Sequence, residues 1–110
     1  MIQKIKEQFH LETLNELQII STNLSAEIIS PEDMSLLINR IFSITHQISG
    51  TGPMLGFDYT SKLSRKIEKT FYDIRSGEKA LNMQIVLQTR RTIDTMIKSI
   101  NDEFNSKKII

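Results

Sequence analysis

One histidine lies in a stretch that is apolar on one side and then loses its side chains, Ile41-Phe42-Ser43-Ile44-Thr45-His46-Gln47-Ile48-Ser49-Gly50. At about 100° per residue, the apolar residues of this stretch form one helical stripe, and His46 falls roughly 140° from its middle. Gly50 follows the histidine by one turn and Phe42 precedes it by one turn, so both share its face. We therefore expect an exposed imidazole beside an aromatic ring and bare backbone, which a partner could approach closely over Gly50.

The residues around this histidine resemble the signature of histidine phosphotransfer (HPt) domains, in which a helix presents His-x-x-Lys-Gly, then small residues, then Leu-Gly-Phe. The matching residues here are His46, Gly50 and, at the same spacing, Leu55-Gly56-Phe57. The likeness is greatest to the N-terminal phosphotransfer domain of CheA-type chemotaxis kinases and covers roughly residues 9 to 104. It continues through Ile67-Glu68, Arg75-Ser76-Gly77-Glu78 and Leu81-Asn82. One residue departs from the signature, because the lysine three positions after the histidine is Ser49 here.

The resemblance implies that His46 accepts a phosphoryl group and that Glu68 orients its ring. The imidazole of free histidine titrates near pH ~6.5, so an unprotonated nitrogen is available at neutral pH. A carboxylate that accepts a hydrogen bond from Nδ1–H would leave the Nε2 lone pair outward as the nucleophile. A helical count places Glu68 about 120° from the centre of its own apolar stripe. From phase alone, the alternative is a surface histidine without a role.

A phosphoryl group on this histidine needs a neighbouring cation, and Ser49 offers one weak hydrogen bond where the family's lysine would stand. Arg65 lies one turn before Glu68 and could supply that cation. The same predicted helix carries four basic residues, Lys62, Arg65, Lys66 and Lys69. Such a basic rim would favour docking to the acidic pocket that the resemblance implies for a receiver domain. The alternatives are that Ser49 is only a small, tolerated residue and that the basic residues form a solvated face.

The function that the resemblance implies is that of a phosphoryl carrier in a two-component, chemotaxis-type phosphorelay. Its donor would be a histidine kinase catalytic domain, and its acceptor or reversible donor the aspartate of a receiver domain. That receiver would bring magnesium, so we expect no cofactor on this chain. Phe42, Gly50 and Lys69 are the expected docking residues. The alternative is an HPt-like interaction module that docks these domains but is impaired in transfer, and a generic helical scaffold is a third reading.

Composition argues against several other classes of function. The net charge of +1 does not favour nucleic-acid binding, and the absence of cysteine excludes a disulfide framework or a thiolate metal site. No signal peptide or membrane-spanning run is present, and no glycine-rich phosphate loop marks an ATP-binding catalytic domain. We therefore expect a cytoplasmic protein that is a monomer as an isolated domain and that could be a fragment of a histidine kinase.

A second histidine stands in the sequence Glu7-x-x-His10, a spacing that di-iron helical bundles use for their ligands. Such sites need the pair twice, together with two further glutamates. At the same spacing before His46 stands Ser43, so the second pair is missing. We therefore expect no metal site.

Hydrophobic periodicity predicts four helices, over residues 2–28, 31–51, 58–75 and 78–104. Ser30 is a suitable cap for the second helix, with proline following it at the first helical position. Pro53 should end or kink that helix, Asp58 should cap the third, and Gly77 suits the left-handed position after it. The stripe predicted for the third helix is Tyr59, Leu63, Ile67, Phe71 and Ile74. Short joints between amphipathic helices predict an all-α, antiparallel up-and-down four-helix bundle, with residues 1–110 forming a single domain.

Overall fold

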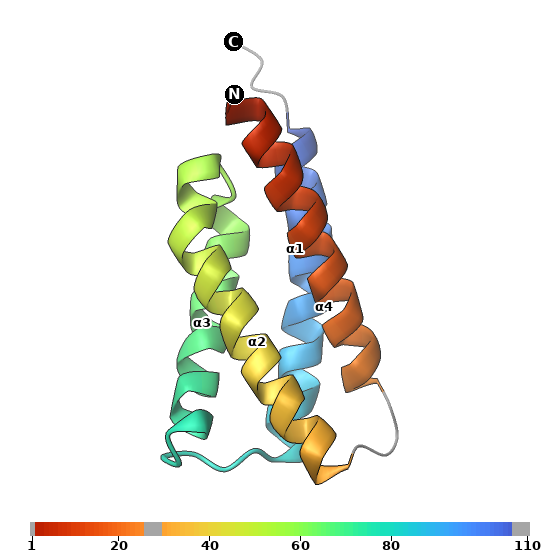
Figure 1. The fold of residues 1–110 in the computed structure, drawn as a ribbon, viewed down its shortest axis with the longest axis vertical. Helices are drawn as coiled ribbons and strands as arrows, with labels where there is room; N and C mark the ends of the chain where they lie inside the picture. Colours follow the sequence, from red (N-terminus) through yellow and green to blue (C-terminus); the bar gives the residue numbers. More distant parts are fainter. Residues whose placement is uncertain (1, 26–29, 107–110) are drawn as a thin grey trace.

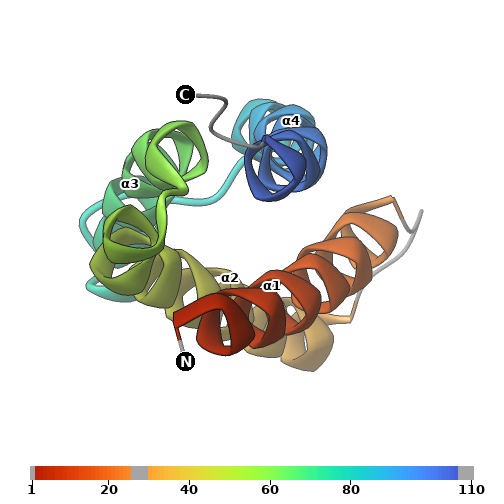
Figure 2. The same cartoon turned by 90° about the horizontal axis from the view of Figure 1, so that it is seen from above.

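The computed structural model describes residues 2–25 and 30–106, and the regular structure of these residues is entirely helical. Its elements are α1 (Ile2–Leu24), α2 (Pro31–Thr51), the short 3₁₀ helix η1 (Gly52–Leu55), α3 (Asp58–Arg75) and α4 (Met83–Asn105). The four long helices alternate in direction along a body of 48 × 25 × 21 Å, as Figure 1 shows. Helix α1 contacts α2 and α4, and α3 contacts the same two helices, so the four helices surround one core. Figure 2 shows this arrangement from above. The predicted all-α four-helix bundle is confirmed.

Several helix ends follow the local signals of the sequence. The Ser30 hydroxyl accepts a hydrogen bond from the backbone N–H of Asp33 at 3.1 Å, and Pro31 is the first residue of α2. Helix α2 ends at Thr51, and the chain continues through Pro53 as a 3₁₀ turn, because proline removes a backbone donor. Gly77 follows α3 with φ of 84°, the left-handed conformation expected there.

The predicted cap of α3 is wrong, because Asp58 is already the first helical residue and Phe57 before it makes no side-chain cap. The cap comes from another helix. The carboxylate of Glu103 on α4 accepts hydrogen bonds from the backbone N–H groups of Tyr59 at 2.8 Å and Thr60 at 3.1 Å. It also accepts one from the Thr60 hydroxyl at 2.6 Å. A capping group so distant in sequence leaves no local signal.

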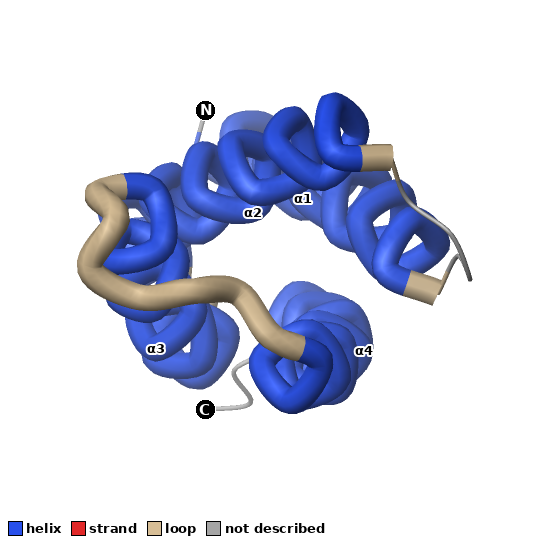
Figure 3. The backbone as a smooth tube through the Cα atoms, turned by 90° about the horizontal axis from the view of Figure 1, so that it is seen from below, coloured by secondary structure: helices blue, strands red, loops and turns tan. Residues whose placement is uncertain are grey.

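Two other predicted boundaries differ from the structure. Helix α4 begins at Met83 rather than at residue 78, because the Asn82 side chain caps it by accepting from the backbone N–H of Ile85 at 2.8 Å. The connection from α3 to α4 crosses the end of the bundle (Figure 3). Helix α1 ends at Leu24 rather than near Ile28, and residues 26–29 lie outside the described part of the chain.

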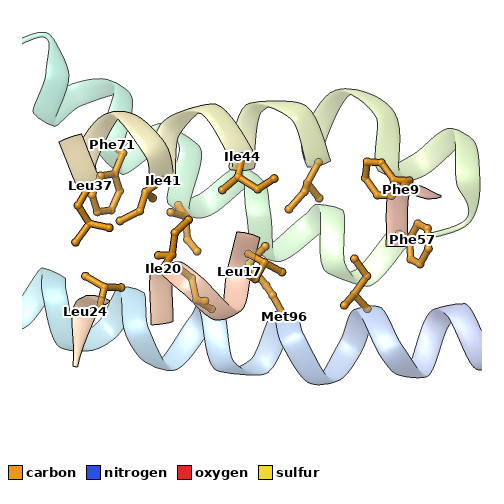
Figure 4. Packing of buried hydrophobic residues seen from close by; sticks show 14 residues of the cluster. Phe9, Leu17, Ile20, Leu24, Leu37, Ile41, Ile44, Phe57, Phe71 and Met96 are labelled. Atoms are coloured by element: carbon orange, nitrogen blue, oxygen red, sulfur yellow. The ribbon is translucent and has the colours of Figure 1, made fainter. Parts of the chain in front are cut away.

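The apolar stripes of the four helices meet in one core that runs along the bundle (Figure 4). Phe9 and Phe57 lie at one end of it, with ring centroids 5.5 Å apart, and Leu24, Leu37 and Phe71 lie toward the other. The fully buried members are Leu17, Ile20, Ile41, Ile48, Phe57, Phe71, Ile93, Met96 and Ile100. Because this core fixes the positions of α2 and α3, it also fixes the outer faces of these two helices.

One side of α3 differs from the predicted stripe. Tyr59 is exposed, whereas the small hydroxyl residues Thr60, Ser61 and Ser64 are fully buried. Ser61 lies 3.3 Å from the Ile48 carbonyl of α2, and it packs so closely on the start of η1 that a Cβ atom on Gly52 would clash with its Oγ. Small side chains at such a contact let two helix backbones approach each other, and here they bring α3 close against α2.

Candidate functional site

His46 lies on the exposed side of α2, as the helical count predicts. Its side chain is 71% exposed, whereas Ile44 and Thr45 before it and Ile48 after it are buried. The apolar neighbours fix the rotation of the helix about its axis, because they must face the core. The imidazole is therefore held at the surface by residues that take no part in its chemistry.

The structure brings His46 and Glu68 together from two different helices. The imidazole Nδ1 lies 2.7 Å from Glu68 Oε2, and the glutamate side chain is only 23% exposed. An ionised carboxylate can only accept hydrogen bonds, so Nδ1 is the protonated nitrogen and donates to it. The neutral ring then carries its lone pair on Nε2, which makes Nε2 the nucleophilic atom.

Aromatic and cationic side chains pack on one side of the imidazole. The ring of Phe42 lies nearly parallel to that of His46, with centroids 5.7 Å apart and planes 13° apart. The Arg75 guanidinium lies over the Phe42 ring, 4.3 Å from its centroid. The Tyr72 ring centroid is 6.3 Å from the Phe42 centroid. Sequence reasoning missed Tyr72 and Arg75. Tyr72 follows Glu68 by one turn and Arg75 follows Tyr72 by one, so helical spacing from Glu68 could have found both.

A shallow hollow of about 330 Å³ opens beside the histidine. Its lining residues are Phe42, His46, Arg65, Glu68, Lys69 and Tyr72. Arg65 therefore faces the same space as the imidazole, as expected from its position one turn before Glu68, and Lys69 lines that space as well. The ion pairs among the described residues are Glu16–Arg40 and His46–Glu68, which leaves Arg65 and Lys69 without a carboxylate partner there.

Gly50 and Ser49 lie one turn beyond the histidine and differ in what they offer. Gly50 is exposed, and a Cβ atom built on it would meet nothing within 4 Å, so the surface above it is open. The Ser49 hydroxyl is buried and has no hydrogen-bond partner. The Ser49 hydroxyl therefore does not reach the surface around the imidazole, and it is not placed to offer the weak hydrogen bond considered for it in the sequence.

The second histidine has a different environment. His10 is 8% exposed, its Nε2–H donates to Asn101 Oδ1 at 2.8 Å, and its ring stacks on Phe104 with centroids 4.1 Å apart. Glu7, the other residue of the Glu7-x-x-His10 spacing, accepts a hydrogen bond from the Gln3 side-chain amide at 3.3 Å. Within residues 2–25 and 30–106, no group of three metal-ligating side chains comes together. Of the helices described, none is both long enough and apolar enough to cross a membrane.

Comparison with known proteins agrees with this geometry. The model of the Hpt domain family matches residues 4–103. The chain is also similar to the sensor histidine kinase CheAY of Helicobacter pylori, with 29% identity over 104 residues. That match covers 92% of this chain but 13% of the relative, and no solved structure matches. The chain belongs to the Hpt family, the histidine phosphotransfer domains of two-component signalling.

Proposed function

We propose that His46 accepts a phosphoryl group on Nε2 and exchanges it with an aspartate of a receiver domain. The observation that carries this proposal is the exposed imidazole whose Nδ1 is held by Glu68 at 2.7 Å. In the step, the Nε2 lone pair forms a bond to phosphorus while the bond from phosphorus to the leaving oxygen breaks. The electron pair of that bond leaves with the oxygen, and Nδ1 keeps its proton.

Glu68 supports this step through the charge that develops on the ring. As Nε2 bonds to phosphorus, positive charge spreads over the imidazole and Nδ1–H becomes a stronger donor. A hydrogen bond to a carboxylate then strengthens, so Glu68 stabilises the phosphorylated ring more than the free one. The same bond keeps Nε2 in the lone-pair form before the reaction. Glu68 thus orients the nucleophile and stabilises its product.

Arg65 is our candidate for the cation beside the phosphoryl group. The group adds between one and two negative charges near neutral pH. Ser49 cannot balance them, because a hydroxyl carries no charge and that of Ser49 is buried. Arg65 and Lys69 line the hollow next to the imidazole. Arg65, one turn from Glu68, would serve the function of the family's lysine from the neighbouring helix.

The partners in this proposal supply everything that the bundle does not. A histidine kinase catalytic domain provides the phosphoryl group, as the name of the CheAY relative suggests. A receiver domain provides the aspartate together with magnesium, and the reaction takes place in the cytoplasm. Phe42, Gly50 and Lys69 contribute to docking around His46. The chain itself is a carrier and needs no cofactor of its own.

The second candidate is an interaction module that docks these partners without transfer, and serine in place of the lysine favours it. Incubation of the chain with an isotopically phosphorylated receiver distinguishes the two. A carrier takes up label that is lost in acid and retained in alkali, the behaviour of a phosphoramidate. Binding of the receiver without any such label would support the module instead.

A further inference from the structure

Directly beside the His46–Glu68 pair, one serine joins α3 to the backbone of α2. The Ser64 hydroxyl donates to the Thr45 carbonyl at 2.9 Å, and Ser64 is completely buried. Thr45 is the residue before His46, and Ser64 lies one helical turn before Glu68. One turn of α2 and one turn of α3 therefore carry both the Ser64–Thr45 hydrogen bond and the His46–Glu68 hydrogen bond.

The contact is specific to this position in the interface. The Thr45 hydroxyl donates to the Ile41 carbonyl of its own helix at 2.7 Å, whereas the Thr45 carbonyl accepts from Ser64 of α3. The Ser61 hydroxyl also touches α2, but it bonds mainly to Phe57 of its own segment at 2.6 Å and lies 3.3 Å from the Ile48 carbonyl. Ser64 has the shorter hydrogen bond between the two helices.

We infer that Ser64 is a positioning residue for the phosphotransfer site, an inference that rests on the proposed function. Its size sets how closely α3 approaches α2, and its hydrogen bond fixes how far α3 slides along α2. Both quantities determine whether Glu68 reaches Nδ1. A displacement of about 1 Å would stretch the 2.7 Å contact beyond ordinary hydrogen-bond length, since N–H···O distances in proteins are about 2.7–3.2 Å.

Two substitutions separate size from hydrogen bonding. Ser64→Val adds bulk and removes the donor, so it should push the helices apart and release His46 from Glu68. Ser64→Ala removes the donor alone and should have a smaller effect in the same direction. Ser99→Ala is the matched control, because the Ser99 hydroxyl is also buried but bonds to Thr60, between α3 and α4.

The direct measurement is ¹⁵N NMR of the imidazole in the isolated domain at a pH where the ring is neutral. The parent and Ser99→Ala should show protonated Nδ1 and lone-pair Nε2, whereas Ser64→Val should show mixed tautomers, as Glu68→Ala does. Ser64→Ala should fall between them. If Ser64→Val does not fold, the Ser64→Ala spectrum decides. Parent-like tautomers in a folded Ser64→Val, or in Ser64→Ala when that is the deciding variant, would overturn the inference.

Transfer rates then show whether Ser64 acts through Glu68. Ser64→Val and Glu68→Ala should each slow phosphorylation of His46 roughly tenfold. The double variant should be no slower than Glu68→Ala, since the bond being positioned is already gone. Multiplying effects would mean that Ser64 acts elsewhere and would refute the inference. Altered tautomers with unchanged transfer would instead refute the proposed role of Glu68 and leave the positioning intact.

Discussion

The two histidines of this chain lie in different environments, and only one of these environments suits phosphoryl transfer. His46 is exposed and donates from Nδ1 to a carboxylate, which leaves Nε2 free at the surface. His10 is buried, and its Nε2–H is used in a bond to Asn101. A phosphoryl donor could reach the first ring without any rearrangement, whereas the second would have to leave the core. Only His46 is therefore suited to accept a group from another protein.

Gly50→Gln should weaken receiver docking and transfer while leaving the fold stable. Gly50 is exposed with open space above it, so a long side chain would occupy volume that a partner needs. Leaving glycine should raise helix stability by roughly 0.5 to 1 kcal/mol. Transfer kinetics and urea unfolding measure the two effects separately. Gly50→Ala is the control and should transfer almost normally; equal rates for glutamine and glycine would exclude this role.

Arg65→Ala should slow transfer or shorten the phosphohistidine lifetime, because Arg65 lines the hollow beside the imidazole. A charge-assisted contact is worth ~1.5–3 kcal/mol, or roughly tenfold to a hundredfold in rate, and solvent screening favours the low end. Lys62→Ala, outside the hollow, should leave the phosphohistidine lifetime unchanged. Ser49→Lys should make Arg65 less important, which a double-mutant cycle on transfer rate measures. Simple additivity would show that Arg65 does not replace the family's lysine.

At the scale of the helices, the start of α3 depends on a residue of α4. Glu103 accepts from two backbone N–H groups of the first turn of α3, which have no partner within their own helix, and also from the Thr60 hydroxyl. Glu103→Gln should lower the free energy of unfolding by about 1–2 kcal/mol, as the loss of a cap does. Urea denaturation tests this value, with Asp102→Asn, at an exposed neighbouring site, as the control. Equal midpoints for the two variants would contradict the capping role.

The same scale shows which features the sequence could predict. Helix number, direction and most core positions follow from a 3.6-residue period, and Ser30, Pro53 and Gly77 act through local backbone chemistry that a single chain segment reveals. The cap of α3 was not predictable in this way, because Glu103 is brought to it by tertiary packing. Tyr59 was placed in the core on hydrophobicity alone, whereas the tight contact with α2 selects small hydroxyl residues.

The candidate site was predictable to a similar degree. Counting about 100° per residue along α2 places His46 outside the core. The family resemblance identifies Glu68, on another helix, as its partner. Helical spacing puts Tyr72 and Arg75 on the same face of α3 as Glu68, but it does not predict their contacts with Phe42, which depend on how α3 lies against α2. The buried Ser49 hydroxyl was also unexpected, since a helical count gives the direction of a residue but not the rotamer of its hydroxyl.

At the scale of the whole molecule, the bundle is built to present one imidazole. Helices α2 and α3 carry the site, while α1 and α4 complete the core and supply the distant cap. The 330 Å³ hollow beside the imidazole is shallow, so the bundle does not enclose a substrate. Under the proposed function, the exposed imidazole would enter the active site of a partner. This shape suits a carrier that meets a donor and an acceptor in turn.

The most direct test of the account is phosphorylation of two histidine variants by a histidine kinase or a phosphorylated receiver. His46→Gln should fold like the parent, because the side chain is 71% exposed, and should take up no acid-labile label. His10→Gln should lose stability, because His10 is buried, but should still take up label at a temperature where it is folded. Label retained by folded His46→Gln, or lost from folded His10→Gln, would contradict the assignment of His46 as the phosphoacceptor.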